Sequence, residues 1–234
     1  MARLWYLPTL IIALCGIVGP AGAYLRVLDP PAGFGLLFLA IMLSLLSLPA
    51  MAGAAAFASA TGKAWRGRAV RAAVVPLLVV VGVVLPNGSR LEPRIHDITT
   101  DPEDTLQFTP DVAARSESMP RDQVLALQRE AYPDLEPLRL DAAPEPALER
   151  VEATAARMPG WEIVRRDPGS GRIEAQARST IFRFVDDVVI RVQPDASGAG
   201  SRVDVRSRSR FGQSDLGANA ARIRAFLAAL AQAS

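Results

Sequence analysis

The chain has 234 residues, half of them hydrophobic, and its formal net charge is +2. Residues 1–86 hold six basic residues and one acidic residue, which leaves 20 basic and 23 acidic residues for 87–234. The positive excess therefore lies in the N-terminal part, and the charge balance gives no support for a nucleic-acid partner. A single cysteine excludes a disulfide framework within the chain. Abundant alanine and only one lysine indicate GC-rich coding and hence a bacterial protein.

Three uncharged apolar runs begin the chain. The first two hold 22 and 28 residues, against roughly 20 needed to cross the hydrocarbon core of a membrane. The third holds 14, so it spans only if Arg71 snorkels and its ends extend. Pro76 lies in its first turns, where a neighbouring helix must satisfy the carbonyl that loses its donor. We predict a membrane domain over 1–86 with three transmembrane helices, at about 4–25, 33–60 and 70–88.

A short basic loop, 63–71, separates the second run from the third. It carries four cationic side chains and no acidic one, and loops of this kind stay in the cytoplasm. The loop at 26–31 has no net charge, and Arg3 adds a positive charge beside the N-terminus. With three spans, the sequence predicts a multi-pass protein of the bacterial inner membrane with a cytoplasmic N-terminus and a periplasmic C-terminal domain. Membrane lipids are the first partner that this implies.

The first run allows two other interpretations. Residues 21–23, Ala-Gly-Ala, resemble a signal-peptidase site, and cleavage there would leave the orientation of the later spans unchanged. Cys15 raises a lipoprotein interpretation, which Leu14 disfavours because a small residue is needed at that place.

Residues 87–141 hold 12 acidic and 6 basic residues and are rich in proline and small polar residues. We predict an extended acidic arm that wraps the following domain and carries one short helix near 121–130. From Pro144 the pattern becomes regular. A helix with proline in its first turn ends at Pro159, and a closing helix spans about 215–231.

Between these two helices lie four strand candidates joined by turn signals, at 161–166, 172–177, 182–193 and 201–209. A short strand at 138–140 adds an edge. The order helix, four strands, helix predicts an α+β domain over 142–234, with an antiparallel sheet of four to five strands covered on one face by two helices.

Three segments are more specific than this pattern. Residues 95–104 read Ile-His-Asp-Ile-Thr-Thr-Asp-Pro-Glu-Asp, 186–191 read Asp-Asp-Val-Val-Ile-Arg, and 204–219 end in Gly-Gln-Ser-Asp-Leu-Gly-Ala-Asn. Together they resemble the bacterial family called domain of unknown function 1499, over roughly 86–230. The resemblance implies membrane-spanning segments ahead of the domain and no particular reaction, cofactor or catalytic residue. Residues 105–108 depart from the proline-rich continuation of that family.

The strand at 201–209 gathers charge on one face. Alternation places five charged side chains there: Arg202, Asp204, Arg206, Arg208 and Arg210. Guanidinium groups beside the start of the closing helix favour an anion site for phosphate, carboxylate or a lipid headgroup. We predict that its ligands are Arg206, Arg208, Arg210 and Ser214.

The alternative is that these arginines pair with acidic neighbours, namely Asp186, Asp187, Glu174 and Asp204. Asp215 and Asn219 are four residues apart on the closing helix and can touch. We therefore interpret this pair as a structural corner between strand and helix.

His96 is the sole histidine, and Asp97 and Asp101 lie close to it in the sequence. These residues are weak candidates for a metal site or for general-base catalysis, because no EF-hand spacing or second histidine accompanies them. We predict no cofactor. The leading hypothesis is a non-catalytic binding or interaction domain held at the outer face of the membrane. The alternatives are an envelope enzyme using His96 and nearby carboxylates, and a structural subunit that packs with other membrane or periplasmic proteins.

Overall fold

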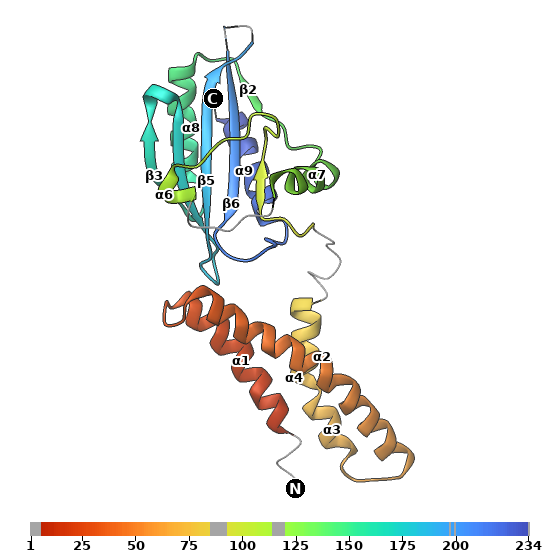
Figure 1. The fold of residues 1–234 in the computed structure, drawn as a ribbon. Coiled ribbons are helices and arrows are strands. Elements are labelled where there is room, and N and C mark those ends of the chain that lie inside the picture. The colour runs from red at the N-terminus through yellow and green to blue at the C-terminus, as the bar shows by residue number, and fades with distance from the viewer. Residues whose placement is uncertain (1–5, 85–92, 114–119, 197, 199, 234) are drawn as a thin grey trace. The chain divides into compact units, whose positions relative to one another are not determined.

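The structure of the protein is a computed structural model that describes residues 6–84, 93–113, 120–196, 198 and 200–233 (Figure 1). The chain forms two compact units, Met1–Leu91 with Thr180–Arg183, and Glu92–Ser179 with Phe184–Ser234. The end of the predicted third span, 85–88, and two stretches of the predicted arm, 87–92 and 114–119, lie outside the described residues.

Two long apolar helices dominate the first unit. They are α1 (Leu7–Tyr24) and α2 (Pro30–Ala60), and they are the two helices of the described chain that are long and apolar enough to cross a membrane. The helices cross closely, because a Cβ atom on Gly19 would lie 2.4 Å from the carbonyl oxygen of Gly33. Close crossings at small residues are a feature of helix pairs in membranes. Apolar helices near an N-terminus occur both as membrane anchors and as signal sequences.

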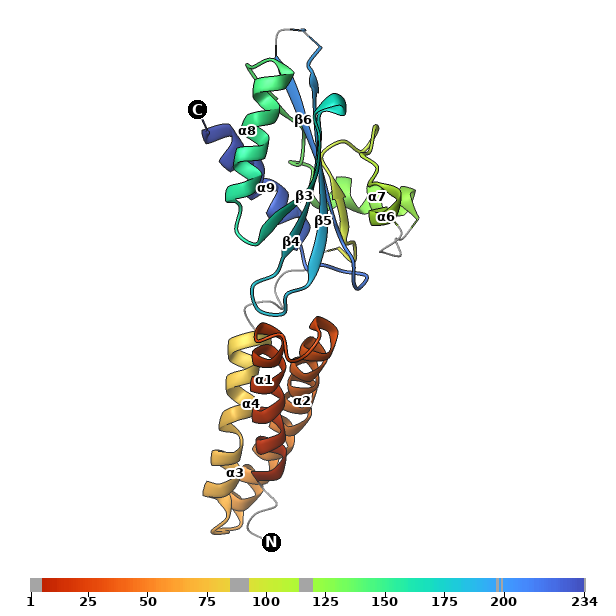
Figure 2. The same ribbon diagram turned by 90° about the vertical axis from the view of Figure 1, so that its left-hand side faces the viewer.

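The third predicted span is not one helix. The chain there is divided into α3 (Arg66–Ala72), α4 (Val74–Val79) and a π-helical turn, η2 (Val80–Val84). The prediction of a third transmembrane helix at about 70–88 is therefore wrong for the described residues, which contain two helices of sufficient length followed by a broken segment. The three pieces lie beside α1 and α2 within this unit (Figures 1 and 2).

The physical reason for the break is Pro76. Proline has no N–H group, so the carbonyl of Ala72, four residues earlier, lacks its helical donor. Thr9 of α1 supplies the missing bond, because its hydroxyl donates to that carbonyl at 2.8 Å. The prediction that a neighbouring helix satisfies this carbonyl is confirmed.

The second unit contains one antiparallel sheet in the order β1-β6-β5-β4-β3, with β2 also paired to β6. The strands are β1 (Asp97–Thr99), β2 (Leu138–Leu140), β3 (Trp161–Asp167), β4 (Arg172–Arg178), β5 (Val185–Pro194) and β6 (Ser201–Ser209). A short turn, η3 (Pro168–Ser170), joins β3 to β4. The predicted α+β fold is confirmed, and β1 raises the number of strands among the described residues to six.

Two helices, α8 (Pro144–Arg157) and α9 (Ala218–Gln232), lie on one face of this sheet, as predicted (Figure 2). The alternating apolar residues of the strands meet the apolar sides of these helices in one continuous core. Within it, the ring of Trp161 stacks on Phe226 with centroids 5.3 Å apart. Burial of these apolar side chains supplies the main driving force for folding of the unit.

The sheet edge at β1 is covered by α7 (Arg121–Ala131), which lies where the sequence predicts a short helix. The side chain of Gln128 is buried and forms two hydrogen bonds to the backbone of Thr99. It accepts from the N–H at 3.0 Å and donates to the carbonyl at 2.7 Å. One glutamine therefore satisfies backbone groups that an edge strand would otherwise leave open.

Candidate functional site

The sheet face opposite α8 and α9 carries the charged side chains. In the register of β5 and β6, Asp204 pairs with Arg191, Arg206 with Val189, and Arg208 with Asp187. Residues on paired positions of neighbouring strands point to the same face of a sheet. The intervening residues, Val203 and Val205, belong to the core, as the alternation predicted.

The arm crosses this charged face and covers part of it. Its short helix α6 (Pro110–Ala113) follows Leu106 and Phe108, and these residues form a small second core with Val112 and Val189 of the sheet. The ring of Phe108 lies against two guanidinium groups, 4.8 Å from that of Arg206 and 4.6 Å from that of Arg208. Cation–π contacts and apolar burial together hold the arm to the sheet.

Arg206 is the most completely engaged of the predicted anion ligands. It is 6% exposed, and its Nε and Nη2 atoms donate to the two carboxylate oxygens of Asp97 at 2.8 and 2.6 Å. Its Nη1 atom donates to the carbonyl of Leu106. Arg121 of α7 approaches the same carboxylate at 3.5 Å. An anion at this position would have to compete with a buried, two-point ion pair.

The other three predicted ligands point to different places. Arg208 donates to the carbonyl of Val112 at 3.1 Å, and burial lowers the pKa of its guanidinium. Arg210 forms a two-point pair with Asp187, at 2.9 and 2.5 Å. The hydroxyl of Ser214 accepts the N–H of Leu216 at 3.4 Å. The structure thus brings Arg206 and Arg208 together on one aromatic ring and leaves Ser214 in the next loop.

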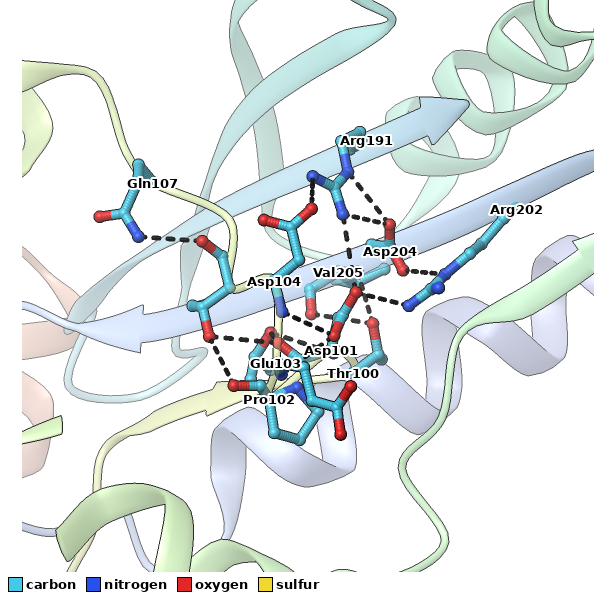
Figure 3. A network of polar contacts seen from close by, with 12 residues as sticks. Thr100, Asp101, Pro102, Glu103, Asp104, Gln107, Arg191, Arg202, Asp204 and Val205 are labelled. Atoms are coloured by element: carbon cyan, nitrogen blue, oxygen red, sulfur yellow. Dashed lines mark hydrogen bonds and ion pairs between the residues drawn. The ribbon is translucent and has the colours of Figure 1, made fainter. Parts of the chain in front are cut away.

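A second network lies further along the same face (Figure 3). The carboxylate of Asp204 is fully buried and accepts from Arg191 at 2.8 Å and from Arg202 at 2.9 Å. The arm contributes Asp101, 2.5 Å from Arg202, and Asp104, 2.7 Å from Arg191. Although burial opposes its charge, hydrogen bonds from Arg191 to Asp204 and Asp104 raise the pKa of the arginine. These ion pairs attach the acidic arm to the arginines of the sheet.

The weak metal candidates do not converge. Asp97 faces Arg206, and Asp101 faces Arg202 while accepting the N–H groups of Glu103 and Asp104. His96 is 5% exposed, and within the described chain its Nε2 atom has no hydrogen-bond partner. No group of three His, Cys, Asp or Glu side chains is placed to hold a metal ion in the part of the chain that the structure describes.

The predicted corner is a buried hydrogen-bond network. Asp215 accepts the N–H groups of Gly217 and Asn219 at 2.9 and 2.8 Å. The amide of Asn219 is fully buried, accepts from Ser207 at 2.6 Å and donates to the carbonyl of His96 at 3.0 Å. Asp215 and Asn219 therefore connect the start of α9 to β6 and to the beginning of the arm.

An open groove lies beside the charged face, where the arm passes the hairpin of β3 and β4. Its volume is about 380 Å³, and its lining comes from the arm and from the hairpin: Gln107, Phe108, Thr109, Pro110, Arg165, Asp167, Ser170, Arg172 and Glu174. Glu174 accepts the N–H of Thr109 at 3.0 Å and its hydroxyl at 2.9 Å, while Arg172 donates to the carbonyl of Gln107. The walls are fixed by these bonds, and the exposed Arg165 stands at the groove.

The sequence did not point to this groove. Turn signals predicted the hairpin that carries Arg172 and Glu174, but nothing in the sequence pairs it with residues 107–110 of the arm. The extended, polar character of the arm was the one available signal, and it carried no information about the path across the sheet.

Fold and contacts define an α+β domain, preceded by two apolar helices, whose charged sheet face is neutralised by an acidic arm. The chain belongs to the family described as "Protein of unknown function (DUF1499)", whose model matches residues 97–230. Among the curated proteins and the solved structures, none matches this chain.

Proposed function

We propose that the protein is anchored in the bacterial inner membrane by its first unit and presents the second unit in the periplasm as a non-catalytic binding module. The proposal treats α3, α4 and η2 together as a third, broken crossing. The observation that carries it is the bond from the hydroxyl of Thr9 to the carbonyl of Ala72 that Pro76 leaves without a donor.

This bond supports a membrane environment, because in water the carbonyl of Ala72 would not need a donor from the protein. In water an unpaired helix carbonyl is solvated at little cost, whereas in hydrocarbon a neighbouring side chain must supply the donor. The contact between Gly19 and Gly33 adds a second feature of helix packing in membranes. The lipid-facing side is also apolar, since Ile17 is 68% and Leu46 is 74% exposed.

The position of the basic loop supports the orientation. Arg66, Arg68 and Arg71 lie in α3, at the start of the broken segment, and Lys63 precedes it. A cytoplasmic position for these charges, with an odd number of crossings, leads the chain to the periplasmic side.

The groove beside the hairpin is the binding surface that we propose, in place of the arginines of β6. The guanidinium groups of Arg206 and Arg208 are engaged with the arm and that of Arg210 with Asp187 of β5, whereas the groove is open and Arg165 is exposed at it. An enzyme using His96 is disfavoured, because this side chain is 5% exposed and its neighbours Asp97 and Asp101 are held by arginines.

Site-specific photocrosslinking in cells tests this function. A photoreactive amino acid at Arg165 is expected to capture a partner protein that the same group at the exposed Arg139 of β2 does not capture. Equal patterns at the two positions, or no adduct at either, would contradict a binding surface at the groove. Resistance of the full chain to extraction from membranes by alkaline carbonate tests the anchor separately.

A further inference from the structure

One loop of the second unit exposes its apolar side chains to an unusual degree. Among the described residues of that unit, the large apolar side chains that are more than half exposed are Phe211, at 56%, and Leu216, at 65%. Both lie in the connection 210–217 between β6 and α9. Leu216 also has a backbone φ of 52°, in the left-handed region that a Cβ atom disfavours. More than half of each of these two side chains thus remains in contact with solvent, although both are apolar.

The loop is held in place by a second aromatic residue. The ring of Phe211 stacks on Phe184, with centroids 5.7 Å apart and planes at 16°. The N–H of Arg210 donates to the carbonyl of Val185 at 3.3 Å, so the start of β5 and the end of β6 lie together. We call Phe184, Phe211 and Leu216 the apolar tip.

The chain enters the second unit at this same end. Asp97 of β1 pairs with Arg208, and the N–H of Asp215 donates to the carbonyl of Ile95 at 3.3 Å. Ten residues, 85–94, separate Val84 of the broken segment from Ile95. A fully extended chain of this length covers about 40 Å. If the first unit is anchored as proposed above, Ile95 stays within that distance of the end of the broken segment, and the loop that carries the apolar tip lies beside Ile95.

We propose that the apolar tip docks on the lipid bilayer that holds the first unit, with Phe211 and Leu216 inserted at the boundary between headgroups and acyl chains. Apolar side chains gain free energy when they leave water for this boundary. The exposed Arg94, next to Ile95, adds a positive charge for anionic headgroups. The tether favours lipid over a soluble partner, because it keeps the membrane surface at a high effective concentration.

Spin labelling of the full chain in lipid nanodiscs of phosphatidylcholine and phosphatidylglycerol tests the proposal. Cys15 is replaced by serine, and a label is placed at Gln213→Cys, which lies between the two apolar side chains and leaves both intact. We expect the label to collide with dissolved oxygen several-fold more than with a water-soluble nickel chelate. A label at the exposed Ala196→Cys, in the loop at the opposite end of β5 and β6, is expected to show the reverse.

Two further variants decide the outcome. Phe211→Ser with Leu216→Ser, in the background labelled at Gln213→Cys, is expected to move the label into water. A label at Leu46→Cys on α2 reports the anchor itself. Lipid contact at Leu46→Cys together with an aqueous label at Gln213→Cys would overturn docking while leaving the anchor in place. Protection of Gln213→Cys in native membranes but not in nanodiscs would also overturn it and indicate a protein partner.

Discussion

The pair of Arg206 and Asp97 joins β6 to the beginning of the arm at a buried position. Both oxygens of the carboxylate accept from the guanidinium, and the aromatic ring of Phe108 covers the other side of Arg206. A buried pair of this kind is costly to break from one side, because the remaining charge stays away from water without its partner. We therefore interpret Arg206 as a residue that positions the arm.

Replacement of Arg206 by methionine tests this role. We expect a loss of about 3–5 kcal/mol in the free energy of unfolding, because Asp97 is left buried without its main partner. Arg139→Met, at an exposed position of β2, is the matched control and is expected to change stability by less than about 0.5 kcal/mol. Urea unfolding of the full chain in detergent micelles, followed by circular dichroism, measures both. Equal losses of unfolding free energy in the two variants would contradict a role of Arg206 in positioning the arm.

The anion prediction for the arginines of β6 has its own measurement. Inorganic phosphate up to millimolar concentration is expected to leave the unfolding midpoint of the full chain unchanged. The guanidinium groups of Arg206 and Arg210 already donate to both oxygens of a carboxylate. A midpoint that rises with phosphate, and no longer rises in Arg210→Gln, would restore an anion site at this face.

Asp215 gives a pH dependence of definite sign. Burial raises its pKa above the ordinary aspartate value of about 3.9, against the hydrogen bonds from Asn219 and Gly217. The folded state therefore holds this proton more readily than the unfolded state, and the contribution of Asp215 to stability falls as pH rises from about 4 through the raised pKa. The stability of wild type relative to Asp215→Asn is expected to increase as pH is lowered through that range. A difference independent of pH would contradict a raised pKa.

At the scale of elements, the broken segment and the hairpin turns show how single residues set the path of the chain. Pro76 divides what hydropathy alone predicts as one helix, and the hydroxyl of Thr9 completes the bonding that the proline removes. In the sheet unit, Gly171 ends the turn η3 with a φ of 63°, which suits glycine. At these two places a specific backbone requirement sets the path of the chain.

A double-mutant cycle tests whether the hydroxyl of Thr9 bonds the carbonyl of Ala72 that Pro76 leaves without a donor. Thr9→Val, which keeps the shape of the side chain, is expected to destabilise the first unit by about 1 kcal/mol. In a Pro76→Ala background the new N–H group can bond the carbonyl of Ala72, so the cost of Thr9→Val is expected to vanish. Thermal unfolding in detergent micelles measures the four proteins. Equal costs of Thr9→Val in both backgrounds would show that the hydroxyl does not serve this carbonyl.

Two glycines allow a matched comparison of backbone strain and steric clash. Gly171 and Gly198 both have positive φ, at 63° and 73°. A Cβ atom on Gly171 would lie 2.2 Å from the carbonyl oxygen of Val192, whereas one on Gly198 would meet nothing within 4 Å. Gly198→Ala is expected to cost about 1–2 kcal/mol. Gly171→Ala is expected to cost a further 1–3 kcal/mol or so, from the clash. Equal unfolding free energies of the two variants would contradict this path of the turn.

Much of the sheet could be predicted because its signals are local. Alternation along β6, turn residues between the hairpins and the apolar stripes of α8 and α9 all lie within short windows of sequence. The pairing of β1 with β6 could not be predicted. A three-residue strand is too short to show a period, and its partner is more than 100 residues away. The same holds for Asp97 with Arg206 and for Glu174 with Thr109. Local patterns indicate which residues face a surface, whereas they carry no information on which distant segment covers it.

At the scale of the whole molecule, two chemically different units share one chain. The first is apolar on its outside, and the second carries a net negative charge whose arginines are largely used to hold its own arm. A short tether joins them, and the proposed function places the first in a membrane and the second in the compartment beyond it. The number of crossings decides that assignment, because two crossings would leave the second unit in the cytoplasm and three place it outside.

Labelling of single cysteines in intact cells counts the crossings most directly. In a Cys15→Ser background, Gly62→Cys reports the basic loop and Ala196→Cys reports the second unit, each probed with a maleimide that does not cross the inner membrane. Three crossings predict that Ala196→Cys reacts without lysis, while Gly62→Cys reacts only after it. If neither cysteine reacts until the cells are lysed, the broken segment does not cross the membrane, and the periplasmic binding module is contradicted.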